Sequence, residues 1–112
     1  TKGLFNADAF KQMKKTAYVV NTARGPIIDE AALAAALDAG EIAGAALDVM
    51  TEEPPVNSPL IGNRKAILTP HTSFYSEESL VELQTKASQE VVAVLSGKPP
   101  RNPVNPDVLQ KA

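Results

Sequence analysis

The stretch that most restricts the fold is residues 19–29, Val-Val-Asn-Thr-Ala-Arg-Gly-Pro-Ile-Ile-Asp. Its β-branched start is typical of a short buried strand, because such side chains pack well on a pleated surface. Gly25 and Pro26 then end the strand, since proline fixes its φ angle and has no backbone N–H to donate. Asp29 precedes an Ala-rich run, and its carboxylate can accept the first N–H groups of a helix. We therefore expect a strand, a turn that carries Arg24, and a helix, in that order.

The rest of the sequence continues this alternation of helices and strands. Strands are expected over 17–20, 42–49 and 66–69, and helices over 7–13, over 30–39 and from the Ser76 cap to Gly97. Prolines indicate a long surface loop over 51–65 and exclude a helix from the tail at 98–106. Alternation of this kind predicts a parallel sheet with right-handed crossovers. The predicted fold class is α/β: about three parallel strands with flanking helices, half of a doubly wound sheet, then a long helix and an extended tail.

Local signals mark the ends of these helices. Asn6 is expected to cap the first helix, with Phe5 and Phe10 packed as a hydrophobic staple. Gly40 is expected to end the second helix in the left-handed conformation. The last helix carries apolar residues at helical spacing, which are expected to form one stripe: Leu80, Leu83, Ala87, Val91 and Val94.

Each predicted strand is followed by side chains that can do chemistry. Arg24 follows the first strand, Asp48 ends the second with Glu53 soon after, and His71, the only histidine, follows the third. Ligands of an open parallel sheet bind at the carboxyl ends of its strands, so these groups are expected at one edge. Taken singly, each residue also has an ordinary structural interpretation. The arginine could form an ion pair or cap a helix, the aspartate could form a turn at the strand end, the glutamate could be an ordinary loop acid, and the histidine could be a surface residue or a hydrogen-bonded core residue.

Charge and composition exclude several classes of function. The net charge of −2 and the lack of a basic cluster argue against nucleic-acid binding. The chain has no cysteine, so it has neither a disulfide framework nor a thiolate metal site; no metal site is predicted, and a cytoplasmic location is expected. No apolar stretch is long enough to cross a bilayer. The sequence lacks an initiator methionine, so we interpret it as part of a longer protein.

Three motifs, in this order and spacing, resemble the D-isomer-specific 2-hydroxyacid dehydrogenase family. They are Asn21-Thr22-Ala23-Arg24-Gly25, then Gly44-Ala45-Ala46-Leu47-Asp48-Val49 with Glu53-Pro54, and finally Thr69-Pro70-His71. The resemblance covers nearly the whole chain. It implies that 1–75 form the C-terminal half of a Rossmann-like NAD(P)-binding domain, and that 76–112 return toward a substrate domain. Residues 74–78 look most similar to the branch near phosphoglycerate-type dehydrogenases and C-terminal-binding-protein corepressors.

The resemblance implies hydride transfer between a nicotinamide cofactor and a D-2-hydroxy acid or 2-keto acid. His71 would be the acid/base, Glu53 would accept a hydrogen bond from its ring and favour the protonated form, and Arg24 would bind the substrate carboxylate or carbonyl. Asp48 would orient the carboxamide of the nicotinamide. The cofactor would be NAD, with NADP as the alternative. The residues implied to contact it are Thr22, Ala23, Arg24, Asp48, His71, Thr72 and Ser73.

The sequence contains no Gly-x-Gly-x-x-Gly, the motif that binds a dinucleotide pyrophosphate. We therefore expect this chain alone to have little or no turnover. The implied partners are a small 2-hydroxy or 2-keto acid and a second copy bound through the NAD-binding domain, with no nucleic acid or membrane. Two alternatives are a corepressor-like module that dimerises on binding NAD, and an inactive half-domain that self-associates through its sheet edge.

Overall fold

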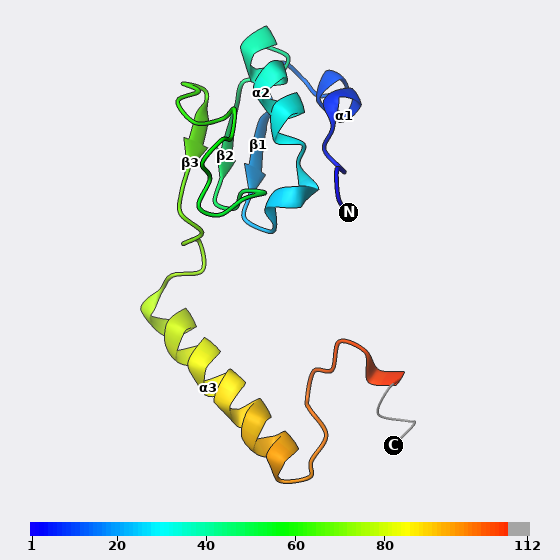
Figure 1. Cartoon of the computed structure of the whole chain (residues 1–112), viewed down its shortest axis with the longest axis vertical. Coiled ribbons are helices and arrows are strands. Elements are labelled where there is room, and N and C mark those ends of the chain that lie inside the picture. The colour runs from blue at the N-terminus through cyan, green and yellow to red at the C-terminus, as the bar shows by residue number, and fades with distance from the viewer. Residues whose placement is uncertain (108–112) are drawn as a thin grey trace. The chain divides into compact units, whose positions relative to one another are not determined.

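The structure is a computed structural model that describes residues 1–107 and divides into two compact units, Thr1–Ser73 and a second that begins at Phe74. In chain order the elements are α1 (Ala7–Lys11), β1 (Tyr18–Asn21), a short 3-10 helix η1 (Gly25–Ile27), α2 (Glu30–Ala39), β2 (Gly44–Leu47), β3 (Ala66–Leu68) and α3 (Glu77–Leu95) (Figure 1). This is the order of helices and strands that the sequence predicts.

The three strands form one parallel sheet in the order β1-β2-β3 (Figure 1). The predicted fold, three parallel strands with flanking helices, is confirmed. Two strands are shorter than predicted: β2 omits both ends of the predicted run 42–49, and β3 ends one residue before the predicted 66–69. The first strand has the predicted length but lies one residue further along the chain than 17–20. Ile42 and Val49 are nevertheless buried. Their apolar character therefore reflects burial beside the sheet rather than membership of a strand.

The core of the first unit lies on one face of the sheet, under α1 and α2. Val19 and Leu47 from the strands pack there with Phe10 from α1 and with Leu33 and Leu37 from α2. Because α2 consists mainly of alanine and leucine, it presents a smooth apolar surface to the sheet. This packing holds the carboxyl ends of the strands, and the turns that follow them, in fixed positions.

The ends of α1 and α2 follow the local signals in the sequence. The side chain of Asn6 accepts hydrogen bonds at the start of α1, and that of Asp29 accepts the N–H of Ala32 over 3.0 Å at the start of α2. Gly40 ends α2 with a φ angle of 67°. The first helix stops at Lys11, two residues earlier than predicted, because the following N–H groups bond back to carbonyls in a tight turn.

The opposite face of the sheet carries exposed apolar side chains. Tyr18 is 75% exposed, and Val20 and Ile67 are also exposed. Side chains alternate between the two faces of a strand, and the helices described in this unit pack on the face that carries Val19. The prediction of a buried strand over 17–20 is therefore wrong for Tyr18 and Val20.

The second unit consists of α3 and the segment after it. A reciprocal capping box starts α3: Ser76 and Ser79 each donate a backbone N–H to the other's hydroxyl, over 3.0 Å. Gly97 follows the helix with a φ angle of 74°. The predicted apolar stripe is present in the sequence of α3, but no residue of this helix is buried within the structure.

The segment after α3 has little regular structure. Residues 98–105 adopt neither helix nor strand, as predicted, but Pro106 and Asp107 are in the 3-10 conformation, so the exclusion of a helix from 98–106 is wrong at Pro106, where proline is compatible with a first helical turn. The Arg101 N–H donates to Oε2 of Glu90 over 2.9 Å, which ties this segment to α3. The last part of the predicted 76–112 segment, 108–112, lies outside the described residues. Among the helices of the described part, none is both long and apolar enough to span a membrane.

Candidate functional site

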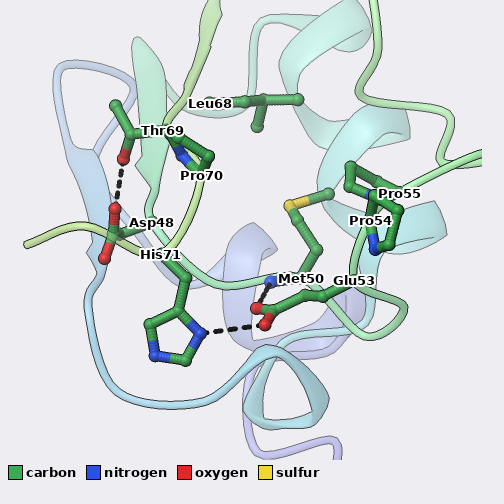
Figure 2. Close-up of a pocket in the computed structure, with 9 residues that line it drawn as sticks. All are labelled: Asp48, Met50, Glu53, Pro54, Pro55, Leu68, Thr69, Pro70 and His71. Atoms are coloured by element: carbon green, nitrogen blue, oxygen red, sulfur yellow. Dashed lines mark hydrogen bonds and ion pairs between the residues drawn. The ribbon is translucent and has the colours of Figure 1, made fainter.

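A pocket of about 400 Å³ opens at the carboxyl ends of β2 and β3 (Figure 2). Its apolar wall comes mainly from the 50–55 segment and the end of β3, whereas its polar groups follow the two strands. The lining residues are Asp48, Met50, Glu53, Pro54, Pro55, Leu68, Thr69, Pro70 and His71. Three of the four side chains singled out from the sequence thus border one cavity.

His71 and Glu53 form a pair at this pocket. Nδ1 of the imidazole lies 2.8 Å from Oε2 of the carboxylate, and the two side chains are 43% and 38% exposed (Figure 2). The other carboxylate oxygen, Oε1, accepts the N–H of Met50 over 2.9 Å. Glu53 is therefore oriented by hydrogen bonds at both of its oxygens.

The electrostatic environment keeps Glu53 ionised. The hydrogen bond from His71 is the largest influence that lowers the pKa of this carboxyl, and the bond from the Met50 N–H and the charges of His71 and Arg24 add to it. An ionised carboxylate only accepts hydrogen bonds, so the proton of the pair lies on Nδ1 of His71. Nε2 lies on the side of the ring away from Glu53, where it can exchange a proton with another group (Figure 2).

Asp48 holds the turn that carries His71. It is only 5% exposed. Its Oδ1 accepts the Thr69 hydroxyl over 2.5 Å and the Thr72 N–H over 2.9 Å, and its Oδ2 accepts the Ser73 N–H over 2.8 Å. Its backbone carbonyl accepts the N–H of His71 over 2.8 Å. A buried carboxylate with this many donors is stabilised in its charged form.

This network has two consequences for the site. The hydrogen bonds, led by that of the Thr69 hydroxyl, hold the pKa of Asp48 well below its usual range. They also stabilise His71 at a φ angle of 54°, a left-handed conformation that non-glycine residues seldom adopt. The sequence resemblance implies a cofactor contact for Asp48, but it does not indicate this second role, in which both carboxylate oxygens bind the 69–73 turn.

Arg24 lies on the turn that follows β1. The buried side chain of Asn21 shapes this turn: its Nδ2 donates to the Arg24 carbonyl, and its Oδ1 accepts the Ala23 N–H, both over 3.0 Å. Arg24 itself is exposed, and its Nη1 donates to the Ala23 carbonyl over 2.6 Å. The guanidinium is close enough to Glu53 to lower the pKa of that carboxyl. Arg24 therefore belongs to the same electrostatic site as the His71–Glu53 pair.

Gly25 allows the Arg24 turn to pack directly on the segment that leads to Glu53. A Cβ atom at this position would lie 2.0 Å from both the carbonyl carbon and the carbonyl oxygen of Met50. No side chain can occupy that space without movement of the backbone. The glycine is thus required by a close approach of two backbone segments.

The other residues predicted to contact a cofactor lie on the same two turns. Thr22 and Ala23 follow β1, whereas Thr72 and Ser73 follow the histidine, and all four are exposed. The N–H groups of Ala23, Thr72 and Ser73 are engaged by the buried Asn21 and Asp48 side chains just described. That these residues contact a cofactor stays a prediction.

Three residues that help to build the site were not assigned from the sequence. Asn21 and Thr69 shape the turns after β1 and β3, and Glu30 binds the loop that contains Glu53. A signal existed for Asn21, because strand alternation places it on the same buried face as Val19. Within residues 1–107, no three His, Cys, Asp or Glu side chains are grouped in a way that would hold a metal ion.

Comparison with known proteins identifies the family. The family model for the NAD-binding domain of D-isomer specific 2-hydroxyacid dehydrogenases matches residues 1–73. The chain belongs to the D-isomer specific 2-hydroxyacid dehydrogenase family. The family resemblance predicted from the three motifs is thereby confirmed, and so is the prediction that the chain contains part of an NAD-binding domain.

Relatives of this family are longer than the chain. The glyoxylate reductase of Thermofilum pendens is 44% identical over 111 residues, which cover 98% of this chain and 33% of that protein. The D-3-phosphoglycerate dehydrogenase of Bacillus subtilis is 40% identical over 111 residues, covering 99% of this chain and 21% of that protein. The chain therefore spans a third or less of the length of these two dehydrogenases.

A solved structure of the family has the same fold. The D-isomer specific 2-hydroxyacid dehydrogenase of Xanthobacter autotrophicus Py2, crystallised with NADPH and MES, superposes with a TM-score of 0.76 at 38% identity. The match covers 96% of this chain and 34% of that one. The three-stranded sheet of the first unit thus corresponds to part of a larger dehydrogenase.

Proposed function

We propose that this chain supplies the catalytic part of the NAD(P)-binding domain of a D-2-hydroxyacid dehydrogenase. The reaction would transfer a hydride between the nicotinamide and a D-2-hydroxy acid or 2-keto acid. The observation that carries this proposal is the 2.8 Å contact between His71 and Glu53 at the carboxyl end of a parallel sheet, with Arg24 close enough to influence Glu53. These groups match the needs of a keto-acid reduction: a proton donor, a carboxylate that orients it, and a cation.

His71 is the acid/base in this proposal. When bound, the nicotinamide supplies the hydride to C2 of the keto acid or accepts it from the hydroxy acid. As the C2 carbonyl oxygen gains negative charge, Nε2 of protonated His71 delivers its proton to that oxygen, and in oxidation neutral His71 takes the proton back. Glu53 keeps the Nδ1 proton in place throughout, so that Nε2 is the nitrogen that reacts.

Arg24 binds the substrate in this proposal. Its guanidinium presents paired N–H donors that match the oxygens of a carboxylate, and it stays charged at all physiological pH values. It is exposed at the strand end rather than in a buried ion pair, which leaves it accessible to a small anion. A 2-keto acid held there by its carboxylate would present its carbonyl oxygen toward the histidine.

The described residues fit part of a dinucleotide site. They provide the carboxyl edge of the sheet and an apolar pocket wall from Met50, Leu68 and Pro70, which suits the flat face of a nicotinamide ring. The residues proposed to contact the cofactor are Thr22, Ala23, Arg24, Asp48, His71, Thr72 and Ser73. A Gly-rich pyrophosphate loop is not in this sequence, so we expect the 112-residue chain alone to lack turnover.

The domain assignment remains part of the proposal. Residues 1–75 would be the C-terminal half of the NAD(P)-binding domain, and 76–112 would return toward the substrate domain. A homodimer through the NAD-binding domain stays a prediction from the family, and a cytoplasmic location stays a prediction from the lack of cysteine.

Steady-state kinetics on the complete gene product test the proposed reaction. With NADH or NADPH and a panel of 2-keto acids, we expect loss of absorbance at the reduced-nicotinamide band, and a fall in kcat of about 10²–10⁴-fold in His71→Asn. Unchanged turnover in that variant would exclude His71 as the acid/base. Absence of turnover together with NAD-dependent dimerisation in sedimentation experiments would instead support the corepressor-like alternative.

A further inference from the structure

Glu30 binds both ends of the loop that contains Glu53. The glutamate is the first residue of α2, and its Oε1 accepts the N–H of Thr51 over 2.6 Å while its Oε2 accepts the hydroxyl of Ser58 over 2.5 Å. These partners lie 21 and 28 residues along the chain. One carboxylate thus closes the segment 51–58 into a loop on the end of α2.

Capping of α2 does not account for these contacts. The cap of this helix is Asp29, whose carboxylate accepts the N–H of Ala32 over 3.0 Å. Glu30 directs both of its oxygens to the loop instead. A negative charge near a helix start is favourable in itself, but that effect would not require a bond to Thr51 or Ser58.

The loop held in this way has no regular structure of its own. No helix or strand occurs between β2 and β3, so the position of Glu53 depends on contacts made by side chains and on close backbone packing. At the start of the loop, Gly25 packs on Met50 and Glu30 binds Thr51. At its other end, the Ser58 hydroxyl provides the second attachment.

The two halves of the His71–Glu53 pair are therefore fixed separately. His71 is on a turn held by the buried Asp48, whereas Glu53 is on the loop held by Glu30. Nδ1 and Oε2 meet at 2.8 Å only if both segments are in place. Displacements of about 1 Å at a catalytic group can lower a rate on the order of 10²-fold.

We propose that Glu30 is a positioning residue, which holds the 51–58 loop so that Glu53 meets the imidazole of His71. Its effect on the reaction rate rests on the proposed dehydrogenase function. Its effect on the His71–Glu53 contact does not, so the two can be tested separately.

The direct test is an NMR titration of the Glu53 side-chain carboxyl in the 112-residue chain. The charged groups that act on Glu53 are His71 and Arg24, and hydrogen bonds from His71 and Met50 lower its pKa. If Glu30→Ala loosens the loop, those bonds weaken and the pKa of Glu53 rises toward that of an ordinary glutamate. Loss of a negative charge alone would move this pKa in the opposite direction, because it favours the ionised form of a neighbouring acid. An unchanged or lowered pKa would overturn the proposal.

Three further variants distinguish the effect of the Glu30 hydrogen bonds on the pKa of Glu53 from the effects of a lost charge or of unfolding. Glu30→Gln keeps an oxygen that can accept the Thr51 N–H and has an NH₂ group that can donate to the Ser58 hydroxyl. The pKa of Glu53 in this variant should therefore stay close to the wild-type value. Ser58→Ala removes one attachment without altering α2, so it should raise the pKa of Glu53 even if Glu30→Ala fails to fold. Glu52→Gln removes a carboxylate from the same loop as a matched control and should not raise it. If the pKa of Glu53 rose as much in Glu52→Gln as in Ser58→Ala, the rise would not depend on the contacts of Glu30, and the proposed positioning role of Glu30 would be contradicted.

Kinetics of the complete gene product test the consequence for catalysis. Glu30→Ala should lower kcat about tenfold with the cofactor KM changed less than about twofold, and Glu30→Gln should recover most of the loss. An unchanged kcat in Glu30→Ala would refute its part in catalysis. If the wild-type protein reduces no 2-keto acid, the proposed function fails, and the Glu53 titration still decides whether Glu30 positions the pair.

Discussion

The hydroxyl of Thr69 donates a hydrogen bond to Oδ1 of Asp48 over 2.5 Å and so joins the end of β3 to the end of β2. The same carboxylate accepts the N–H groups of Thr72 and Ser73, on the far side of His71. The histidine thus lies on a short turn that is attached to Asp48 before and after it. This arrangement makes a buried aspartate the support of the proposed acid/base.

Asp48→Asn should therefore impair the site, although the two side chains are almost equal in volume. An amide keeps one acceptor oxygen, but its NH₂ group would face either the Ser73 N–H or the donors now bound to Oδ1, and one of these N–H groups would lose its acceptor. We expect faster amide hydrogen exchange at Thr72 or Ser73, whichever N–H faces the NH₂ group, and a fall in kcat on the order of 10²-fold. Thr69→Ser, which keeps a hydroxyl beside Asp48, is the control. Wild-type exchange rates in Asp48→Asn would contradict this account.

The pH dependence of stability follows from the lowered pKa of Glu53. Its pKa in the folded chain lies below that of the unfolded chain, so the unfolded state binds more protons between the two values, and stability increases with pH across that interval. The stabilisation is complete above about pH 4.3, the ordinary value for glutamate, and is lost as the pH falls through the lowered value.

Melting curves of the 112-residue chain and of Glu53→Gln at several pH values check this sign. The difference in Tm between the two proteins should be largest near neutral pH and should shrink as the solution is acidified below about pH 4. Glu52→Gln, an exposed neighbour in the same loop, should not reproduce this pattern. A difference that grew on acidification would mean that the carboxylate is not stabilised in its charged form.

How much of this site the sequence predicts depends on how far apart in the sequence the contacting residues lie. The caps at Asp29 and Ser76 and the turn at Gly40 were predicted correctly, because each depends on residues within a few positions. Glu53 and His71 were expected at the same edge of the sheet, because functional side chains of a parallel sheet gather at the carboxyl ends of its strands. Their 2.8 Å contact could not be derived from strand patterns alone, since it depends on loops that carry no periodic signal.

Contacts across long sequence separations were not predicted. Glu30 follows a cap residue and is typical of the first turn of a helix, so nothing local indicates that it binds Thr51 and Ser58. Burial was misjudged at Tyr18 and Val20 for a different reason. An apolar strand sequence indicates that both faces suit burial, but only the packing of other segments determines which face is covered.

Gly25→Ala should disturb the contact between the Arg24 turn and the Glu53 loop. The added Cβ would overlap the Met50 carbonyl group at 2.0 Å, so one of the two backbone segments must move. Overpacking of this kind costs about 1–3 kcal/mol of the free energy of unfolding, and here it also moves the loop of Glu53. Denaturant unfolding measures the first effect, and kcat of the complete gene product measures the second.

Gly40→Ala is the matched control for that substitution. A Cβ atom added at Gly40 would lie in open space, but the φ angle there is 67°, so alanine should cost about 1 kcal/mol in backbone strain. Gly40 lies at the end of α2 away from Glu30, so kcat should not change. Equal losses of kcat in the two variants would show that Gly25 acts only through overall stability.

Arg24→Lys tests whether the arginine acts through its charge or through the geometry of its guanidinium. Lysine keeps the positive charge that helps to lower the pKa of Glu53, but it cannot offer two parallel N–H donors to a carboxylate. We therefore expect the KM for the 2-keto acid to rise about tenfold or more while the titration of Glu53 stays close to wild type. Arg24→Gln removes the charge as well, so it should raise the substrate KM further and also raise the pKa of Glu53. If Arg24→Lys bound the keto acid as well as the wild type does, a positive charge alone would be sufficient at this position, and the two-donor geometry would not be needed.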